Sequence, residues 1–573
     1  MLSATNFSFS YPALEQNALS EVSFSLGSGE VLGVIGPNGS GKTTLCMALA
    51  GVAPRLTGGQ TAGTLEVCGL NPQTVAGAEM AKYVGLVFED YASQITQVEV
   101  LDEVMAPLLN RGAAKADAAE RARYLLRRVG LGSATYERKR TWELSGGQQQ
   151  RVAIAAVLAL SPPVLLLDNI TGMLDLAGKE EVHNLIRELA GETTLLVVEN
   201  DIDLLVRVSD RLLALVGGQA IAQGPPAELL QRDDVVEQAG IDRPASLRLA
   251  RALGLPEVPL TVEAFDGLPS ARALEARSGS PVPAEPSLGE PLLRFDGVAY
   301  RYPDGTAALE GAELTVRESE VHALVGGNGA GKTTMAKLAT GILKPTSGQV
   351  TVGSKSTHQQ TVAQLAQTIG TTFQNPDEQI SESTVAEELR FPLRARQYQR
   401  VGWFKKRQRY SDAYIQQRIE RACELVGLDA AWLERDPIML SFGQRKLVTL
   451  AEALVLDPPV LVLDEPRAGL DGASRQQIGQ AIARLQALGK AVVLVEHDID
   501  FVCELANTAT LLDRGGIALQ GPIRQVFARS NWDLLARLHV RPPRLAQMAQ
   551  YWQVEALSLE ELVAQLALVP EKR

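Results

Sequence analysis

A glycine-rich motif that occurs twice constrains the fold of this 573-residue chain more than any other feature. GPNGSGKTT at residues 36–44 returns as GGNGAGKTT at residues 326–334, and the two copies lie 290 residues apart. LSGGQ at 144–148 and LSFGQ at 440–444 form a second matched pair at a similar offset. Motifs that recur at one spacing indicate an internal repeat. The chain is therefore predicted to contain two copies of one domain.

The segment between the two copies has the composition of a linker. Residues 265–290 are rich in Pro, Ser, Gly and Ala and follow neither helical nor strand periodicity. They are expected to separate a first domain of residues 1–264 from a second domain of residues 291–573. Each copy also ends in a similar segment, RPASLRLARALG in the first and RPPRLAQMAQYW in the second. This similarity predicts a short C-terminal helical appendix on each domain.

Apolar segments around the glycine-rich motifs predict an α/β fold. VLGVIG and VHALVG run directly into the motifs, and helical residues follow, which is the order strand, phosphate loop, helix. The uninterrupted apolar runs VLLLD, VLVLD, TLLVVE and AVVLVE are typical of buried parallel strands, and helical stretches alternate with them. Each domain is therefore expected to have a parallel sheet at its core.

The composition argues against several classes of protein. The formal net charge of −12 is unfavourable for sequence-independent binding to nucleic acid, which depends on accumulated Lys and Arg. The four cysteines have no CxxC spacing, so no zinc site, iron–sulfur cluster or disulfide framework is expected. No apolar run reaches ~18 residues, and the N-terminus lacks a signal-peptide pattern. The chain is therefore expected to lie in a reducing cytoplasm and not to cross a membrane.

The glycine-rich motif has the chemistry of a phosphate loop. In GxxxxGK[ST] the glycines let backbone N–H groups converge on phosphate oxygens, the lysine reaches the terminal phosphates, and the hydroxyl ligates magnesium. A chance glycine-rich turn is the alternative, but the full motif occurs twice, each time in the strand-to-helix context. In each copy an Asp ends a later apolar strand, and these residues, Asp168 and Asp464, are expected to hold Mg²⁺ directly or through water.

Together these motifs resemble those of the ATP-binding-cassette (ABC) ATPase family, and the resemblance covers nearly the whole chain apart from the linker. LSGGQ is the specific element, because phosphate loops alone occur in many NTPases. The resemblance implies two tandem P-loop NTPase domains, each with a RecA-like core, a helical subdomain and the appendix, which bind and hydrolyse ATP with Mg²⁺. It also implies that the domains face each other head to tail, so that each ATP lies between one phosphate loop and the other domain's LSGGQ or LSFGQ segment.

The resemblance assigns site residues by position. Nucleotide-binding residues expected from the first domain are Tyr11, Gly36, Asn38, Gly39, Gly41, Lys42, Thr43, Thr44, Ser145, Gly146, Gly147 and Gln148. Those expected from the second domain are Tyr302, Gly326, Asn328, Gly329, Gly331, Lys332, Thr333, Thr334, Ser441, Gly443 and Gln444. The magnesium site is expected to involve Thr43, Asp168, Thr333, Gln374 and Asp464. The two tyrosines match the family's adenine-stacking position, and an ordinary core or surface tyrosine is the alternative.

The two ATP sites are not expected to be equal. By the resemblance, a glutamate follows the magnesium aspartate and polarises the attacking water; the second domain has Glu465 there, whereas the first has Asn169. An uncharged amide cannot accept the proton of the water, so this help is lost in the first domain. The glutamine that the family carries after the strand VGLVF or IGTTF is Gln374 in the second domain but Glu89 in the first.

Two further departures fall on the same site. The switch histidine of the family is His497 in the second domain but Asn200 in the first, and Phe442 interrupts the LSFGQ segment that faces the first phosphate loop. We therefore expect one hydrolytic site, with Glu465, His497 and Gln374 as its catalytic residues, and one site that mainly binds nucleotide. Slow turnover at the substituted site by another route is the alternative.

Within the family, the chain looks most like the ATPases of energy-coupling-factor (ECF) importers, which drive uptake of vitamins and metal ions in prokaryotes. FQNPDEQ at 373–379 and the RP-containing appendices carry this resemblance, whereas FEDYASQ at 88–94 departs from it. The implied partners are a transmembrane coupling subunit and a substrate-binding membrane subunit, which hold the chain at the cytoplasmic face of the membrane and choose the substrate. The alternative is a soluble twin-cassette protein such as a ribosome-acting translation factor, whose linker is typically long, charged and helical.

One segment has no counterpart of similar character in the first domain. RARQYQRVGWFKKRQRY, at residues 394–410, is basic and aromatic. A solvated insertion on the helical subdomain is expected, and contact with anionic lipid head groups or with a partner is the alternative.

Overall fold

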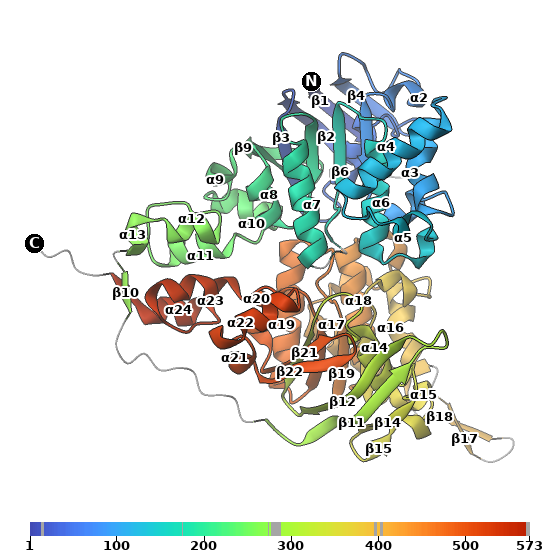
Figure 1. The fold of residues 1–573 in the computed structure, drawn as a ribbon. Helices are drawn as coiled ribbons and strands as arrows, with labels where there is room; N and C mark the ends of the chain where they lie inside the picture. The colour runs from blue at the N-terminus through green and yellow to red at the C-terminus, as the bar shows by residue number, and fades with distance from the viewer. Residues whose placement is uncertain are drawn as a thin grey trace, which may run out of the picture. The chain divides into compact units, whose positions relative to one another are not determined.

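The computed structural model describes residues 1–12, 16–172, 174, 176–272, 274–276, 288–394, 398–401, 405–408 and 410–568. The chain divides into two compact units. The first is Met1–Leu268 with Asp471–Ala473, and the second is Pro269–Leu470 with Ser474–Arg573. Figure 1 shows the helices and strands of each unit.

The core of the first unit is a six-stranded sheet. Its order is β5 (Val84–Val87), β6 (Val164–Asp168), β7 (Thr194–Val198), β3 (Val31–Ile35), β8 (Arg211–Val216) and β9 (Gln219–Gly224). Neighbouring strands run parallel from β5 to β8, and β9 is antiparallel to β8. Along β6, Leu165 and Leu167 enter one hydrophobic cluster, whereas Val164 and Leu166 enter another. Both faces of the sheet are thus buried, which explains the uninterrupted apolar run in the sequence.

Two groups of elements cover this sheet in the first unit. On one face, α1 (Lys42–Leu49) packs with a small antiparallel sheet of β2 (Leu19–Leu26), β1 (Leu2–Ser10) and β4 (Gln60–Val67). On the other face, the cluster joins the sheet to a helical subdomain of α3 (Val100–Leu109), α4 (Lys115–Arg128) and α6 (Gly146–Leu158). The C-terminal helices α10 (Asp233–Ala239), α11 (Ala245–Ala252) and α12 (Val262–Asp266) follow, and Val235, Val236 and Leu247 enter the same cluster.

The second unit repeats this plan. Its large sheet has the order β16 (Ile369–Thr372), β19 (Val460–Asp464), β20 (Ala491–Val495), β13 (Val321–Val325), β21 (Thr508–Asp513) and β22 (Gly516–Pro522). Its small sheet has the order β12 (Ala307–Arg317), β11 (Pro291–Arg301), β14 (Ser347–Val352) and β15 (Lys355–Ser356). The phosphate-loop helix is α14 (Lys332–Ala339), and the helical subdomain contains α16 (Val385–Arg394), α17 (Asp412–Val426) and α18 (Phe442–Leu454). The appendix contains α22 (Trp532–Arg537), α23 (Arg544–Ala549) and α24 (Leu559–Gln565). The predicted α/β fold with a parallel-sheet core, a helical subdomain and a helical appendix is confirmed in both units.

Part of the segment expected to be a linker has regular structure. After α12, the chain forms α13 (Pro269–Arg272) and β10 (Leu274–Ala276), and β10 pairs antiparallel with β23 (Leu566–Leu568). Ala271 and Leu274 are buried, and the indole N–H of Trp552 donates to the Ala271 carbonyl at 3.2 Å. Apolar side chains and a backbone ladder therefore fix this part of the chain onto the second unit. Residues 273 and 277–287 lie outside the described residues.

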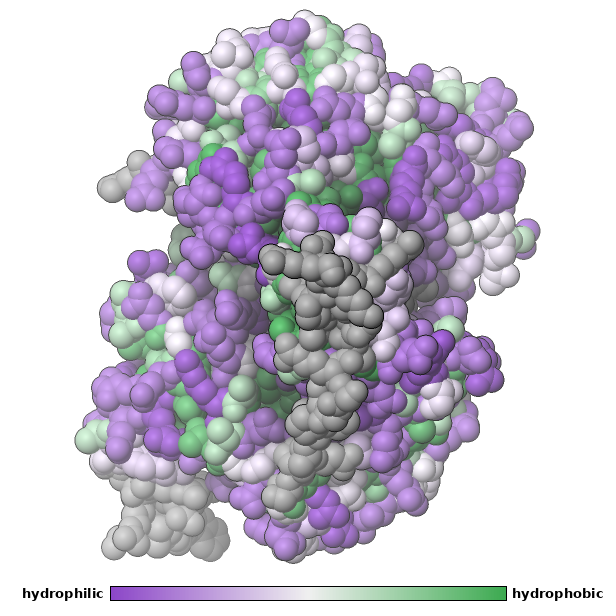
Figure 2. Space-filling view, turned by 90° about the vertical axis from the view of Figure 1, so that its left-hand side faces the viewer, coloured by the Kyte–Doolittle hydropathy of each residue, from purple (hydrophilic) through white to green (hydrophobic). Residues whose placement is uncertain are grey.

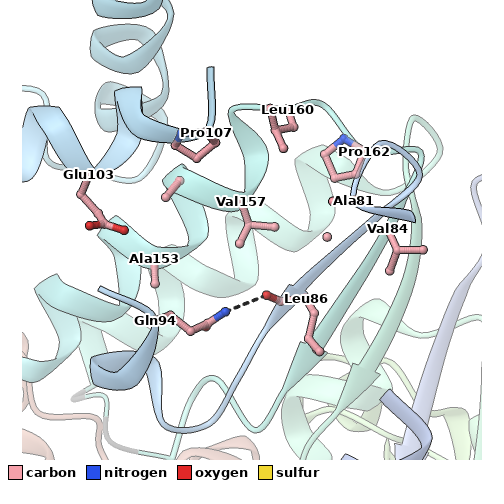
Figure 3. Close-up of a pocket in the computed structure, with 12 residues that line it drawn as sticks. Ala81, Val84, Leu86, Gln94, Glu103, Pro107, Ala153, Val157, Leu160 and Pro162 are labelled. Atoms are coloured by element: carbon pink, nitrogen blue, oxygen red, sulfur yellow. Dashed lines mark hydrogen bonds between the residues drawn. The ribbon is translucent and has the colours of Figure 1, made fainter. Parts of the chain in front are cut away.

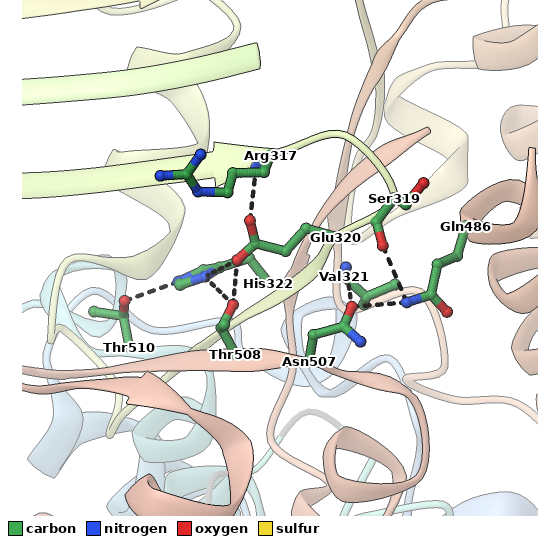
Figure 4. A network of polar contacts seen from close by, with 9 residues as sticks. All are labelled: Arg317, Ser319, Glu320, Val321, His322, Gln486, Asn507, Thr508 and Thr510. Carbon is green, nitrogen blue, oxygen red and sulfur yellow. Dashed lines mark hydrogen bonds and ion pairs between the residues drawn. The ribbon is translucent and has the colours of Figure 1, made fainter. Parts of the chain in front are cut away.

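A buried polar network anchors β13, the strand that leads into the second phosphate loop (Figure 4). Glu320 accepts from the backbone N–H of Arg317 at 2.6 Å and from the hydroxyl of Thr508. His322 contacts Glu320 and Thr508 through Nδ1, and Thr510 through Nε2, at 3.4, 2.7 and 2.8 Å. These side chains tie β13 to β21, so that the loop begins from a fixed strand end.

The predicted insertion at 394–410 is described only in part. It contains β17 (Tyr398–Val401) and β18 (Lys405–Gln408), which pair antiparallel, whereas residues 395–397, 402–404 and 409 lie outside the described residues. Its expected role as a solvated insertion stays a prediction. On the face seen in Figure 2, hydrophilic residues predominate and hydrophobic ones form small areas. Of the helices in the described part of the chain, none has both the length and the apolar character that a membrane span requires.

Candidate functional site

The two phosphate loops have the backbone geometry that their glycines predict. Gly41 and Gly331 cap α1 and α14 at φ 97° and 106°, in the left-handed region that disfavours a side chain. A Cβ at these positions would lie 2.5 Å from the Ala18 carbonyl oxygen and 2.6 Å from that of Ala308. Each loop therefore needs glycine at this position, both for its conformation and for its close approach to a neighbouring strand.

Both loop lysines are buried beside their own loops. Lys42 Nζ donates to the carbonyls of Gly36 and Pro37 at 2.6 and 2.9 Å. Lys332 Nζ makes the corresponding bonds to Gly326 and Gly327 at 2.8 and 2.9 Å. Burial lowers the pKa of Lys42, and nearby carboxylates oppose this effect. Each lysine ammonium therefore lies at its phosphate loop, which is where the sequence predicts a cation that contacts the terminal phosphates.

The expected magnesium residues are brought together in each unit. The Thr43 side chain lies close enough to Asp168 to lower the pKa of that carboxyl, and Thr333 has the same effect on Asp464. Burial raises the pKa of Asp168 and raises that of Asp464 to about 6. Asp168 Oδ2 is buried and has no hydrogen-bond partner among the described residues, although a buried carboxylate oxygen normally has one. A hydroxyl and a carboxylate beside a phosphate loop are ligands that suit Mg²⁺, so these residues fit the ion.

In the second unit, three predicted catalytic residues meet at the end of β19. Glu465 Oε2 accepts from Gln374 Nε2 at 2.7 Å, and Glu465 Oε1 lies 3.0 Å from His497 Nε2. Burial opposes ionisation of Glu465, but the hydrogen bond from His497 and the charges of Lys332 and Lys446 outweigh it, so the pKa of Glu465 is lowered. The side chain is therefore an ionised carboxylate at neutral pH, held by two donors.

Two residues of this cluster were not predicted from the sequence. Lys446, on α18, donates from Nζ to the Glu465 carbonyl at 2.6 Å, and burial lowers its pKa to about 8. Glu496 is buried, and its Oε2 accepts from the backbone N–H of His497 at 3.0 Å. The only signal in the sequence is that Glu496 is a charged residue at the end of the apolar run AVVLV, and Lys446 has no such signal. Both hold the backbone around the catalytic side chains.

In the first unit, the corresponding side chains form a different arrangement. Asn169 Nδ2 donates to Glu89 Oε1 at 2.6 Å, so the two substituted positions are hydrogen-bond partners. Burial raises the pKa of Glu89, and the hydrogen bond from Asn169 opposes the rise. Asn200 follows the buried Glu199 as His497 follows Glu496. The carboxylate of this pair therefore lies on the loop after β5, and the end of β6 carries an amide.

The LSGGQ and LSFGQ segments form the N-termini of α6 and α18. Ser145 and Ser441 are the N-caps, and their hydroxyls accept from the backbone N–H of Gln148 and Gln444 at 3.4 and 3.3 Å. The glutamine side chains accept in return from the serine N–H groups, which completes a capping box. The Phe442 ring lies 5.4 Å from Lys446 Nζ. Each segment thus presents a helix N-terminus, which favours anions.

The two candidate adenine-stacking tyrosines lie next to the phosphate-loop helices. The Tyr11 hydroxyl is 3.1 Å from Thr44 Oγ1, and the Tyr302 hydroxyl is 3.0 Å from Thr334 Oγ1. Both rings are partly exposed, and Tyr302 packs edge-on against Tyr300 with centroids 5.0 Å apart. Both rings therefore lie near the phosphate-loop helix, and the stacking role stays a prediction.

A cavity of about 270 Å³ opens between the sheet and the helical subdomain of the first unit (Figure 3). Its lining is mainly apolar, with Gln94 and Glu103 as polar members. Gln94 Nε2 donates to the Leu86 carbonyl at 3.0 Å. Ala156 also lines it, and the corresponding residue of the second unit is Glu452, which accepts from Gln379 Nε2 at 2.7 Å. The two units therefore differ in polarity beside the loops that carry Glu89 and Gln374.

Comparisons with known proteins agree on one family. The family described as "ABC transporter" matches residues 19–172 and 309–468. A protein of Caldanaerobacter subterraneus subsp. tengcongensis, provisionally named an ABC transporter ATP-binding protein, is 31% identical over 564 residues, with 96% of each chain covered. One of Methanosarcina acetivorans with the same provisional name is 32% identical over 560 residues, covering 94% of this chain and 88% of that protein.

A solved structure, titled as cbiO1 from Clostridium perfringens and as part of the ABC transporter complex cbiONQ, is also similar. It is 32% identical, covers 45% of this chain and 97% of its own, and has a TM-score of 0.38. The family assignment depends on the sequence matches, which extend through both units.

Proposed function

Because the chain belongs to the ABC transporter family, we propose that it is the energy-coupling ATPase subunit of a membrane importer of the ECF type. ATP binding and ATPase activity follow from the family. The importer assignment is supported by the FQNPDEQ segment at 373–379 and by the RP-containing appendices. The partners we propose are a transmembrane coupling subunit and a substrate-binding membrane subunit, with this chain at the cytoplasmic face of the membrane in a prokaryote.

The observation that carries the proposal is the arrangement around Glu465. A water that attacks the terminal phosphate must lose its proton, and an ionised carboxylate beside the phosphate loop can polarise it. Gln374 and His497 each hold one oxygen of this carboxylate, so its orientation is fixed before the reaction. The second unit therefore supplies a preorganised acceptor for the proton of the water.

Mg²⁺ would be held in this unit by Thr333 and Asp464, with Gln374 nearby, and when bound it supplies charge that neutralises the phosphates. Lys332 contributes a further positive charge at the end of its loop. Gly331 opens the N-terminus of α14, whose backbone N–H groups favour phosphate oxygens. Binding and orientation of the triphosphate thus come from the loop, and proton transfer involves Glu465.

The first unit supports binding of ATP without an equal rate of hydrolysis. Lys42, Thr43 and Asp168 have the arrangement seen in the second unit, so the phosphate loop and the magnesium residues are present. Asn169 has no carboxylate to accept a proton, and its amide is already bonded to Glu89. We therefore assign hydrolysis to the second site and lasting nucleotide binding to the first.

The coupling subunit that we propose must contact this chain at a surface close to the nucleotide sites. The cavity beside Gln94 and Glu103 is apolar and adjoins the loop that carries Glu89, so we assign it to a helix of the coupling subunit. Purification of the chain from detergent-solubilised membranes tests the importer role. Recovery with membrane proteins is expected, and recovery with ribosomes instead would refute the importer role.

The steady-state ATPase rate of two matched variants tests the catalytic assignment. Glu465→Gln keeps the shape of the side chain but removes the carboxylate, and a loss on the order of 100-fold is expected. Asn169→Gln alters the corresponding position of the first unit and should change the rate by less than about threefold. Circular dichroism and nucleotide binding show whether both variants fold. Equal rates in the two variants would contradict the assignment.

A further inference from the structure

The substituted positions of the first unit correspond in backbone to those of the second. Asn169 and Glu465 both have a left-handed conformation, with φ of 50° and 46°. Their N–H groups donate to the carbonyls of Val198 and Val495, which end β7 and β20, at 2.8 and 3.0 Å. The backbone at this position therefore has the same left-handed conformation and the same hydrogen bond in both units. The difference between the two units lies in the side chains alone.

Those side chains make the same hydrogen bond with the donor and the acceptor exchanged. In the second unit the amide of Gln374 donates to the carboxylate of Glu465 at 2.7 Å. In the first unit the amide of Asn169 donates to the carboxylate of Glu89 at 2.6 Å. Each unit thus has one amide and one carboxylate at these two positions, and the net charge of the pair is the same.

In both units the carboxylate of the pair interacts electrostatically with the phosphate-loop lysine. The charge of Glu89 interacts with that of Lys42, as the charge of Glu465 interacts with that of Lys332. An exchange of amide and carboxylate therefore keeps one negative charge near the phosphate-loop lysine in each unit. It removes the carboxylate only from the strand end, which is the position that faces an attacking water in the proposed function.

The two positions of the first unit also restrict each other. A carboxylate at residue 169 would have no N–H to donate, so the 2.6 Å hydrogen bond to Glu89 would be replaced by a contact between two acceptor oxygens. With Glu89 present, an amide at 169 is the compatible partner. A change at either of these two positions therefore alters the contact made by the other.

We propose that Glu89 is a positioning residue of the first site: it fixes the Asn169 amide, excludes a carboxylate from the end of β6, and preserves the charge of the nucleotide site. This inference deepens the proposed function and rests on it, since it explains how the first site binds nucleotide with an amide in place of the water-polarising carboxylate. Asn169 and Glu89 together decide which of the two sites hydrolyses.

A double-mutant cycle with shape-conserving variants tests the proposal. Glu89→Gln, Asn169→Asp and the double variant are made in the full chain carrying Lys332→Ala, so that the first site dominates nucleotide binding. The probe is a fluorescent, non-hydrolysable ATP analogue with Mg²⁺. Thermal unfolding without nucleotide is measured beside each affinity, because a merely structural role would lower the unfolding temperature and leave the affinity unchanged.

The expected pattern is non-additive. Asn169→Asp should weaken binding at least tenfold, Glu89→Gln should weaken it more than threefold, and the double variant should return to within threefold of the parent. The proposal is overturned if the two single effects multiply to give the double effect, or if only the unfolding temperature responds. The mirror pair, Gln374→Glu with Glu465→Gln in a Lys42→Ala chain, should show the same rescue at the second site.

The two proposals fail in different ways. If the cycle shows no coupling while Glu465→Gln still abolishes hydrolysis, the exchanged pair is wrong and the proposed function stands. If Glu465→Gln retains the parent rate, the proposed function is wrong whatever the cycle shows.

Discussion

Glu452 should make the stability of the second unit depend on pH, and Glu452→Gln should remove that dependence. The carboxyl lies on α18 and accepts from Gln379 Nε2 at 2.7 Å. Burial, with the nearby Glu388, raises its pKa from 4.5 to about 8. Glutamine keeps the size of the side chain and an oxygen that can accept the same bond, but it does not titrate.

The sign of this pH dependence follows from the number of protons bound in the folded and unfolded states. Between pH 4.5 and about 8 the folded chain keeps a proton that the unfolded chain has released, so the free energy of unfolding falls as pH rises through this window. Each pKa unit corresponds to about 1.4 kcal/mol, which gives a ceiling on the order of 5 kcal/mol for the whole window. At pH 5 the wild-type chain and the variant should have similar stability. At pH 9 the variant should be the more stable by at least about 2 kcal/mol.

Differential scanning calorimetry of the full chain between pH 5 and 9 measures the effect. For a unit of this size, each kcal/mol corresponds to about 2–4 °C in the midpoint of unfolding, so the variant should gain several degrees at high pH. Glu424→Gln, on an exposed part of α17, controls for the loss of a negative charge. Parallel midpoint curves for the wild-type chain and Glu452→Gln would refute the reasoning.

Three further outcomes are expected. Gly331→Ala should abolish nucleotide binding at the second site and most of the ATPase activity, because the new Cβ would lie 2.6 Å from the Ala308 carbonyl oxygen at φ 106°; unchanged activity would contradict this. Glu320→Gln should lower the unfolding midpoint more at pH 7 than at pH 3. Burial raises the pKa of Glu320, but the hydrogen bonds from His322 and Thr508 outweigh it, so the pKa is lowered. The stabilisation by this carboxylate is therefore lost as pH falls through its pKa. Trp552→Phe should cost about 1 kcal/mol in thermal unfolding through loss of the bond to the Ala271 carbonyl, with the ATPase rate unchanged.

The fold could be predicted from the sequence because its signals are local. The phosphate loops need glycine at fixed positions, and the buried strands are continuous apolar runs such as VLLLD and VLVLD. The same holds for Asp168 and Asp464, which end strands that the hydropathy pattern identifies. A functional residue at the end of a strand can be identified from the sequence once that strand has been predicted.

The pairing of side chains across elements could not be predicted. Glu89 and Asn169 are 80 residues apart, and the sequence presents them as two separate losses rather than as partners in one hydrogen bond. Lys446 lies within a helix, and nothing local indicates that its ammonium reaches the Glu465 carbonyl. Such contacts depend on how helix and sheet pack, and packing distances are set by the whole core.

The ladder between β10 and β23 makes the two ends of the second unit neighbours. Leu274 pairs with Leu568, although 294 residues separate them along the chain. A circular permutant of this unit, joined by a short connection between these strands and opened at an exposed surface turn, should keep its sheet and its phosphate loop. A version that starts after residue 287 lacks β10, so β23 and Trp552 lose the segment that they hold.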